Sequence, residues 1–157
     1  MRALLLAVLS ASCSVSRGAP PVRVVREGQP GLVLACSLVE VDRALAEARC
    51  ATAAREWRAL CERAGGLQDA APASVVFFSE RLVVVPVPFD VDMQQVEVSS
   101  EEGVDVVTVD VAPAERSAPR PRVALLRLQR RSCQLAVVLR DDVRGAERTL
   151  AVYPPTR

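Results

Sequence analysis

The chain of 157 residues contains no histidine, lysine, asparagine or isoleucine. Histidine and lysine supply many of the general bases and nucleophilic amines that enzymes use at neutral pH. Their absence excludes Ser-His-Asp and Cys-His catalytic sites, HExxH zinc sites, lysine Schiff bases and the P-loop lysine. Without asparagine, N-glycosylation is excluded as well. We therefore expect a protein that is not an enzyme and that has no catalytic residues, no cofactor and no metal.

Aromatic residues and net charge are also scarce. The chain has one tryptophan, one tyrosine and three phenylalanines, and its formal net charge is +1. Few aromatic side chains can stack on bases, and a nearly neutral chain has no general attraction for phosphates. We therefore expect no nucleic-acid partner and take a protein as the candidate partner. Half of the residues are hydrophobic, which favours a folded core over disorder.

Residues 1–19 resemble an export signal. Arg2 gives a short positive start, residues 3–9 are apolar, and residues 10–12 (Ser-Ala-Ser) offer small side chains for cleavage. The apolar run is much shorter than the roughly 20 residues of a transmembrane helix. We expect an exported protein in the periplasm, the cell envelope or the extracellular space, with residues 20–157 forming one β-rich domain. A buried N-terminal strand or helix is the alternative.

Cys13 follows directly on the small residues of this segment. The arrangement resembles a bacterial lipoprotein signal, in which the cysteine becomes the lipidated first residue. Ser10 stands where such signals usually carry a bulky residue, so ordinary cleavage is the alternative to lipidation. We expect membrane attachment only through this lipid. The excess of Ala, Arg, Val and Pro over Ile, Lys, Asn, Phe and Tyr is typical of GC-rich genomes and points to a bacterium.

Four further cysteines are candidates for disulfide bonds: Cys36, Cys50, Cys61 and Cys133. An even number in an exported chain favours two bridges. If residues 42–64 form one helix, Cys50 and Cys61 lie on one face about 16 Å apart, which is too far for a disulfide. We therefore expect Cys36 and Cys133, on strands, each to bridge to that helix face. Four free thiols are the alternative; a zinc site is disfavoured because no C-x₂-C pair is present.

One helix is predicted, over residues 42–64. Asp42 is the candidate N-cap, and Gly65-Gly66 should end the helix. Apolar residues recur at helical spacing along this segment, so that one face should pack on a core. Trp57 is the expected main anchor of that face.

The rest of the chain predicts strands. Pro86 and Pro88 cannot donate backbone hydrogen bonds, so a strand should end there or lie at a sheet edge. Ser99–Gly103 is typical of a hairpin turn. The sequence therefore predicts an α+β fold, a mainly antiparallel β sandwich or open barrel with the amphipathic helix packed on it. The expected strands cover residues 22–26, 32–41, 75–78, 82–85, 93–98, 104–111, 123–128, 133–140 and 148–153.

Charge is distributed unevenly along the chain. Residues 90–115 contain eight acidic and no basic residues, and residues 116–131 contain six arginines and no acidic residue. One interpretation is ion pairing between adjacent hairpins. The other is a face that binds a partner, in which case salt would weaken the binding.

Paired carboxylates could also do acid–base chemistry without histidine, but the pattern singles out no two of the nineteen acids. Asp90-Val91-Asp92 resembles part of a calcium loop whose glycine and glutamate are not in place.

The stretch from Glu56 to about Tyr153 resembles the C-terminal domain of protease complex subunit PrcB, found in exported bacterial proteins. Three pieces carry the resemblance: Glu56–Leu60 (E-W-x-x-L), Phe78–Val85 at the entry of a valine-rich strand, and Cys133–Val138 in a final strand. The family commonly has a Gly-Gly-Tyr turn where this chain has Phe89–Met93. The resemblance implies a small exported β-rich domain with a binding or accessory role and supplies no catalytic residues.

Together these features predict a non-enzymatic binding or accessory domain at the bacterial cell envelope. A hydrolase that uses paired carboxylates and a structural component of the envelope are the alternatives. The sequence identifies neither the partner nor the oligomeric state.

Overall fold

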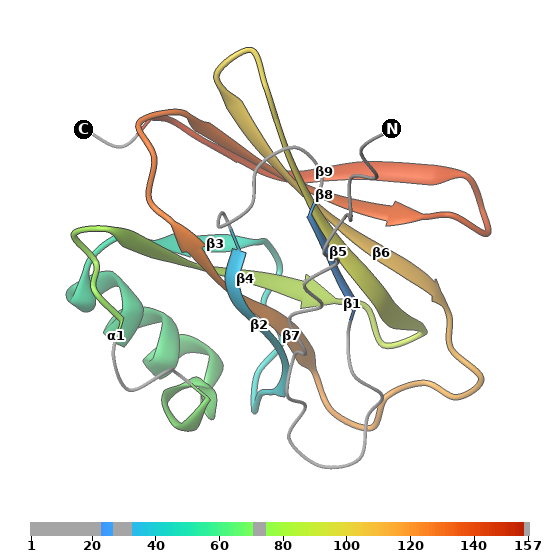
Figure 1. Ribbon diagram of the computed structural model, residues 1–157. Helices are drawn as coiled ribbons and strands as arrows, with labels where there is room; N and C mark the ends of the chain where they lie inside the picture. Colours follow the sequence, from blue (N-terminus) through green and yellow to red (C-terminus); the bar gives the residue numbers. More distant parts are fainter. Residues whose placement is uncertain (1–22, 27–32, 71–74, 156–157) are drawn as a thin grey trace, which may run out of the picture.

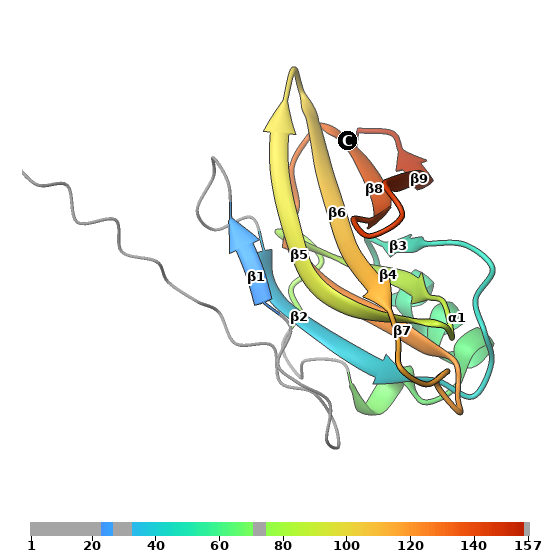
Figure 2. The same cartoon turned by 90° about the vertical axis from the view of Figure 1, so that its right-hand side faces the viewer.

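Two β-sheets face each other, and one helix covers the outer face of the second sheet (Figures 1 and 2). The computed structural model describes residues 23–26, 33–70 and 75–155. The predicted export signal and Cys13 lie outside these residues. The expected α+β fold is confirmed, and it is a sandwich rather than a closed barrel. None of the described helices is long and apolar enough to cross a membrane.

The first sheet has the strand order β1-β5-β6-β8-β9 and the second the order β2-β7-β4-β3. The helix is α1 (Ala54–Ala64), and a short 3₁₀ turn, η1 (Leu67–Asp69), follows it. The strands are β1 (Arg23–Arg26), β2 (Val33–Glu40), β3 (Arg49–Ala51), β4 (Glu80–Val87), β5 (Val91–Glu101), β6 (Val104–Pro113), β7 (Arg122–Gln129), β8 (Gln134–Asp141) and β9 (Ala146–Tyr153).

Strand direction differs between the two sheets. The second sheet is antiparallel throughout, as expected. The first sheet is mixed, because β1 runs parallel to β5 and β6 runs parallel to β8. The β6–β8 pair is parallel because the chain crosses to the second sheet between them to form β7. The sequence alternation predicted most of the strands, but not which neighbour each strand would pair with.

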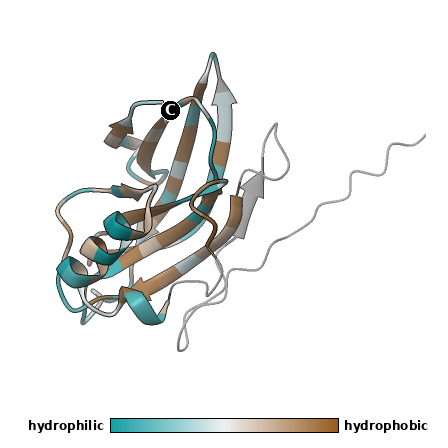
Figure 3. Cartoon of the chain, turned by 90° about the vertical axis from the view of Figure 1, so that its left-hand side faces the viewer, coloured by the Kyte–Doolittle hydropathy of each residue, from teal (hydrophilic) through white to brown (hydrophobic). Residues whose placement is uncertain are grey.

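Two hydrophobic clusters hold the layers together. One lies between the sheets, and the other lies between the second sheet and α1. Strand β4 contributes to both, since Val83 and Val85 face the first cluster while Leu82 and Val84 face the second, and all four are fully buried. Figure 3 shows the hydrophobic strand segments in the interior and hydrophilic residues on the helix.

The predicted turn between β5 and β6 is confirmed. Glu102 and Gly103 form the turn with φ values of 49° and 81°. Two successive positive φ angles match the right-handed twist of the flanking strands and favour glycine at the second position. Beyond the turn, Val107, Val109 and Val111 point into the core between the sheets.

The predicted helix is wrong in its first half. Arg49–Ala51 pair with β4 as the edge strand β3, so α1 begins only at Ala54. Asp42 lies exposed in a loop and is not the N-cap, which is Ala53. Instead Glu56 organises the helix start, because its carboxylate accepts hydrogen bonds from the backbone N–H and the hydroxyl of Thr52 at 2.8 and 3.0 Å.

The end of the helix is as expected, but its anchor is not. The helix stops at Gly65, where φ is 70°. Leu60 and Ala64 are the buried residues of α1, whereas Trp57 is half-buried at the margin of the second cluster. The shorter helix rests on the sheet through its C-terminal half, which moves the main contact away from Trp57.

The expected strand over residues 75–78 is a turn. The backbone N–H groups of Ser79 and Glu80 both donate to the carbonyl of Val76 at 2.9 Å. The Glu80 carboxylate accepts two hydrogen bonds from Arg127, at 2.6 and 2.7 Å, and one from the Val76 N–H at 3.1 Å. These bonds bend the chain where its β-forming residues alone predict extension, and they leave Phe78 92% exposed.

A buried ion pair joins the two sheets at one end of the core. Arg81 on β4 donates to Asp105 on β6 at 3.0 Å, and their side chains are 1% and 0% exposed. Asp105 also accepts from Arg131 at 3.1 Å and from the Cys133 thiol at 2.9 Å. Such a pair is expensive to break from one side, because the partner left behind is a buried charge.

The segregated charges form pairs within the fold. Arg122 binds Asp92 and Arg131 binds Asp105, each at 3.1 Å, so that acids from residues 90–115 meet arginines from residues 116–131. The interpretation as pairing between hairpins is correct for these two pairs. Two other acids of the segment, Glu97 and Asp110, pair instead with Arg140 on β8.

The cysteines of the described residues do not form the expected disulfide bonds. Within the described residues no two cysteines lie at disulfide distance. Cys36 and Cys50 stand in one row of the second sheet, on its two edge strands, three strand spacings or about 14 Å apart. Cys61 lies on α1, against the opposite face of that sheet. Cys50 and Cys61 are indeed not joined, but the shared helix that we expected to separate them does not exist.

The buried ion pair predicts a large effect of Asp105→Ala. The change leaves the Arg81 charge in the core without its carboxylate, so the free energy of unfolding should fall by about 3–5 kcal/mol. Asp92→Ala is the matched control, since that carboxylate is 53% exposed, and it should cost less than about 1 kcal/mol. Urea unfolding of the two variants checks this. Equal losses would show that the buried pair contributes nothing special.

Glu80 predicts a pH effect. The hydrogen bonds from Arg127, followed by that from Val76, lower the pKa of Glu80 below the ordinary 4.5. A lowered folded-state pKa stabilises the protein above about pH 4.5, and this stabilisation is lost as the pH falls through the folded-state pKa. The stability difference between wild type and Glu80→Gln should therefore shrink from about pH 7 to about pH 3 in urea unfolding. A constant difference would contradict this.

Candidate functional site

The sandwich is open on one side, and the cause is the shortness of β3. This strand covers only Leu82–Val84 of β4. Beyond Val84, β4 has β7 as its one neighbour in the described residues, so the expectation of a sheet edge at Pro86 is confirmed. Proline has no N–H to offer a further strand. A loop with Ala44 and Leu45 passes here instead, and a cavity of about 200 Å³ lies between the sheets.

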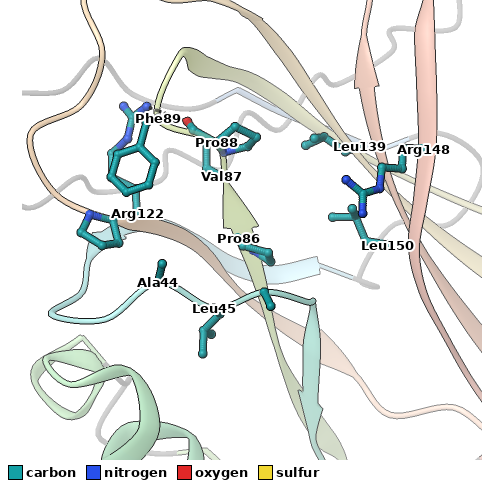
Figure 4. Close-up of a pocket in the computed structure, with 12 residues that line it drawn as sticks. Ala44, Leu45, Pro86, Val87, Pro88, Phe89, Arg122, Leu139, Arg148 and Leu150 are labelled. Carbon is teal, nitrogen blue, oxygen red and sulfur yellow. Dashed lines mark hydrogen bonds between the residues drawn. The ribbon is translucent and has the colours of Figure 1, made fainter.

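The lining of this pocket is apolar with two arginines. Leu45 and Pro86 come from the second sheet and its loop, and Leu139 and Leu150 from β8 and β9 of the first. Figure 4 shows Phe89 and Arg122 on one side of the opening and Leu139, Arg148 and Leu150 on the other. None of the described residues that line the pocket is acidic. A comparable apolar cavity of about 150 Å³ accepts a benzene-sized group, so there is room for one large apolar side chain.

Arg122 braces the pocket wall. Its guanidinium donates to Asp92 at 3.1 Å, to the carbonyl of Val91 at 2.5 Å and to that of Pro88 at 3.4 Å. These bonds fix the connection between β4 and β5, on which Phe89 sits. The side chain of Arg122 is 14% exposed and its charge is already paired. Its role is therefore to shape the site rather than to meet a ligand.

Arg148 is in the opposite situation. It stands on β9 across from Leu139 of β8 and is exposed at the pocket rim. None of the hydrogen bonds and ion pairs between described residues involves its guanidinium. Arg148 thus places a positive charge at the rim of an apolar pocket, and no residue in the described part of the chain pairs with this charge. This combination fits a ligand with an apolar group and a nearby carboxylate.

The acidic residues that the sequence suggested for chemistry or calcium binding lie outside the pocket lining. Asp92 is held by Arg122, and Asp90 is exposed in the β4–β5 connection. The structure does bring Glu97 and Asp110 together, because Arg140 binds both at 2.9 Å on the outer face of the first sheet. These hydrogen bonds raise the pKa of Arg140, and its charge lies between the two carboxylates. The arrangement is an ion network on the flat face of a sheet.

The thiols of Cys50 and Cys133 are less reactive than that of a free cysteine. Burial raises the pKa of Cys50 to about 11, and the nearby charge of Arg81 offsets only part of this effect. Burial and the hydrogen bond to Asp105 raise the pKa of Cys133. A thiol with a raised pKa is protonated at neutral pH and is a weak nucleophile. Among the described residues, no group of three or more cysteine or acidic side chains could hold a metal ion.

Sequence reasoning missed Leu45, Leu150 and Arg148 as site residues. Pro86 and Pro88 carried the one usable signal, since they marked where a strand would lose a neighbour. Which residues would line the resulting gap depends on how the two sheets stack, and strand alternation does not contain that information. Arg148 has no distinguishing neighbours in sequence.

No protein-family model matches the chain, and comparisons with curated proteins and with solved structures gave no match.

The two arginines of the pocket should respond differently to truncation. Arg122→Ala removes three hydrogen bonds made by a largely buried charge, so the free energy of unfolding should fall by about 1–3 kcal/mol. Arg148→Ala removes an exposed side chain with no partner among the described residues and should change it by less than about 0.5 kcal/mol. Urea unfolding distinguishes the two. A large loss for Arg148→Ala would show that this charge is already engaged.

Proposed function

We propose that this chain is an exported, non-enzymatic binding or accessory domain of the bacterial cell envelope. Its pocket would receive an apolar side chain of a protein partner beside a carboxylate. One observation carries the proposal: an apolar cavity of about 200 Å³ that opens between the sheets, with Arg148 exposed at its rim and no acid among the described residues that line it. The cell-envelope location is supported by the signal-like residues 1–19 and by Cys13.

The chemistry of the pocket supports binding rather than turnover. A catalytic site needs a positioned base, acid or nucleophile, whereas the lining offers aliphatic and proline carbons, one phenyl ring and two guanidinium groups. Prolines and packed aliphatic side chains form a wall that needs little ordering when a ligand enters. Preformed walls of this kind lower the entropic cost of binding.

The size of the pocket limits what one contact can contribute. Full burial of a leucine or phenylalanine side chain stabilises a complex by about 1.5–3 kcal/mol. A micromolar complex requires about 8 kcal/mol. The pocket therefore accounts for an anchor residue, and the partner must make further contacts around it. Arg148 is one such contact, because a carboxylate would find no competing acid in the lining.

A peptide library tests the proposal. Random nine-residue peptides displayed on phage are selected on the purified mature protein. We expect enrichment of sequences in which a large apolar residue stands within two positions of an acid. Their binding should be lost with Leu150→Asp, which places a carboxylate in the pocket lining, because an apolar side chain cannot pack there without removing water from the charged group.

Val152→Asp is the matched control, since it makes the same change on the same strand. Val152 is 58% exposed and pairs with Ala136 on the outer face of the sheet. Selected peptides should bind this variant as they bind the wild type. Peptides that tolerate Leu150→Asp, or that share no apolar residue, would refute the pocket as the binding site.

A further inference from the structure

Strand β9 leaves one edge of the first sheet unpaired. It is the last strand in that sheet, and within the described residues no strand pairs with its outer side. A free strand edge presents a row of N–H and C=O groups that an extended chain can satisfy. β9 is eight residues long, whereas β3, the edge of the second sheet nearest to it, has only three. Of these two edges, β9 is the one long enough to template a peptide.

The unpaired edge and the pocket form one surface. Arg148 and Leu150 belong to β9 and also line the pocket, as Figure 4 shows. A strand added beside β9 would lie about 4.8 Å away, with every second side chain directed into the gap between the sheets. There it would meet Val87 of β4 on the other wall. Backbone pairing would thus deliver an apolar side chain to the cavity.

The register of β9 makes both side chains available. The pairing with β8 shifts between Val137 and Val138, so Leu150 has no residue opposite it. Arg148 and Leu150 both reach the pocket because side chains two residues apart on a strand point to the same face. Bulges also twist a strand edge and limit how far a second strand can follow it. The geometry therefore suits a short partner segment.

We infer that the partner binds as a short extended peptide that adds to the first sheet beside β9. It places one apolar side chain in the pocket and a carboxylate opposite Arg148. The inference rests on the proposed function and specifies how the same site recognises its ligand. A carboxylate is favoured because opposite charges on neighbouring strands attract and like charges repel, and no acid of the lining competes for Arg148.

Selective N-methylation tests the backbone part of this inference. The probe is an acetylated and amidated seven-residue peptide with Thr at its odd positions and Glu, Leu and Val at its even positions. In an added strand, alternate N–H groups face β9 and solvent. Methylating the three even-position nitrogens in one version, and three odd-position nitrogens in another, should give one version that binds at least about tenfold more weakly. The other version should bind like the parent in calorimetry.

A charge exchange tests the contact with Arg148. Arg148→Glu should weaken binding of the Glu peptide about fivefold, and a peptide with Lys in place of Glu should recover it. Arg58→Glu is the control with the same charge change, because Arg58 is exposed on α1, across the second sheet from the pocket. It should leave the affinity for either peptide unchanged.

The outcomes separate this inference from the proposed function. Equal effects of the two methylation patterns, or no binding of the parent peptide, would overturn strand addition. If library peptides still lose binding with Leu150→Asp, the pocket remains a binding site that recognises its ligand in another way. Equal loss with Arg148→Glu and Arg58→Glu would remove Arg148 from the contact.

Discussion

The double burial of β4 determines how the rest of the molecule is arranged. Leu82, Val83, Val84 and Val85 are each 0% exposed, so both faces of this strand must be covered. The first sheet covers one face, and α1, η1 and the loop with Leu45 cover the other. A strand that is apolar on consecutive positions cannot be stable at the surface of a two-layer sandwich. It requires a third layer, and the single helix supplies it.

The two ends of β4 differ in how the space around them is closed. At its start, Glu80 and Arg81 are fixed by Arg127 and Asp105, so that charges close the core on both faces of the sheet. At its far end, Pro86 offers no N–H and β3 has already ended, so that the sheets stay apart. The ion pairs hold the sandwich together where the pocket does not weaken it. The pocket is thus a local gap at the end of β4, where no strand among the described residues continues the sheet.

Sequence alone predicted the fold class and most strands, because Val alternation, hairpin turns and glycine stops are local signals. It failed where a distant partner decides the outcome. Arg49–Ala51 were predicted to be helical because arginine and alanine are good helix formers, but pairing with β4 makes them a strand. Residues 75–78 read as strand, and the contact between Glu80 and Arg127 makes them a turn. The sequence did not predict the pocket for the same reason, since its walls come from segments up to about a hundred residues apart.

An open edge beside an apolar pocket also invites self-association, and the charges of β9 bear on this. Two β9 strands from different molecules, paired antiparallel, would in some registers set Arg148 against Arg148 or Glu147 against Glu147. Like charges directly opposite one another destabilise a strand pair. The bulge at Leu150 further disturbs a long, regular match. In those registers the like charges disfavour a second copy of the chain, whereas the peptide that we propose would carry a carboxylate opposite Arg148. The same arginine would then both select the partner and discourage the competing dimer.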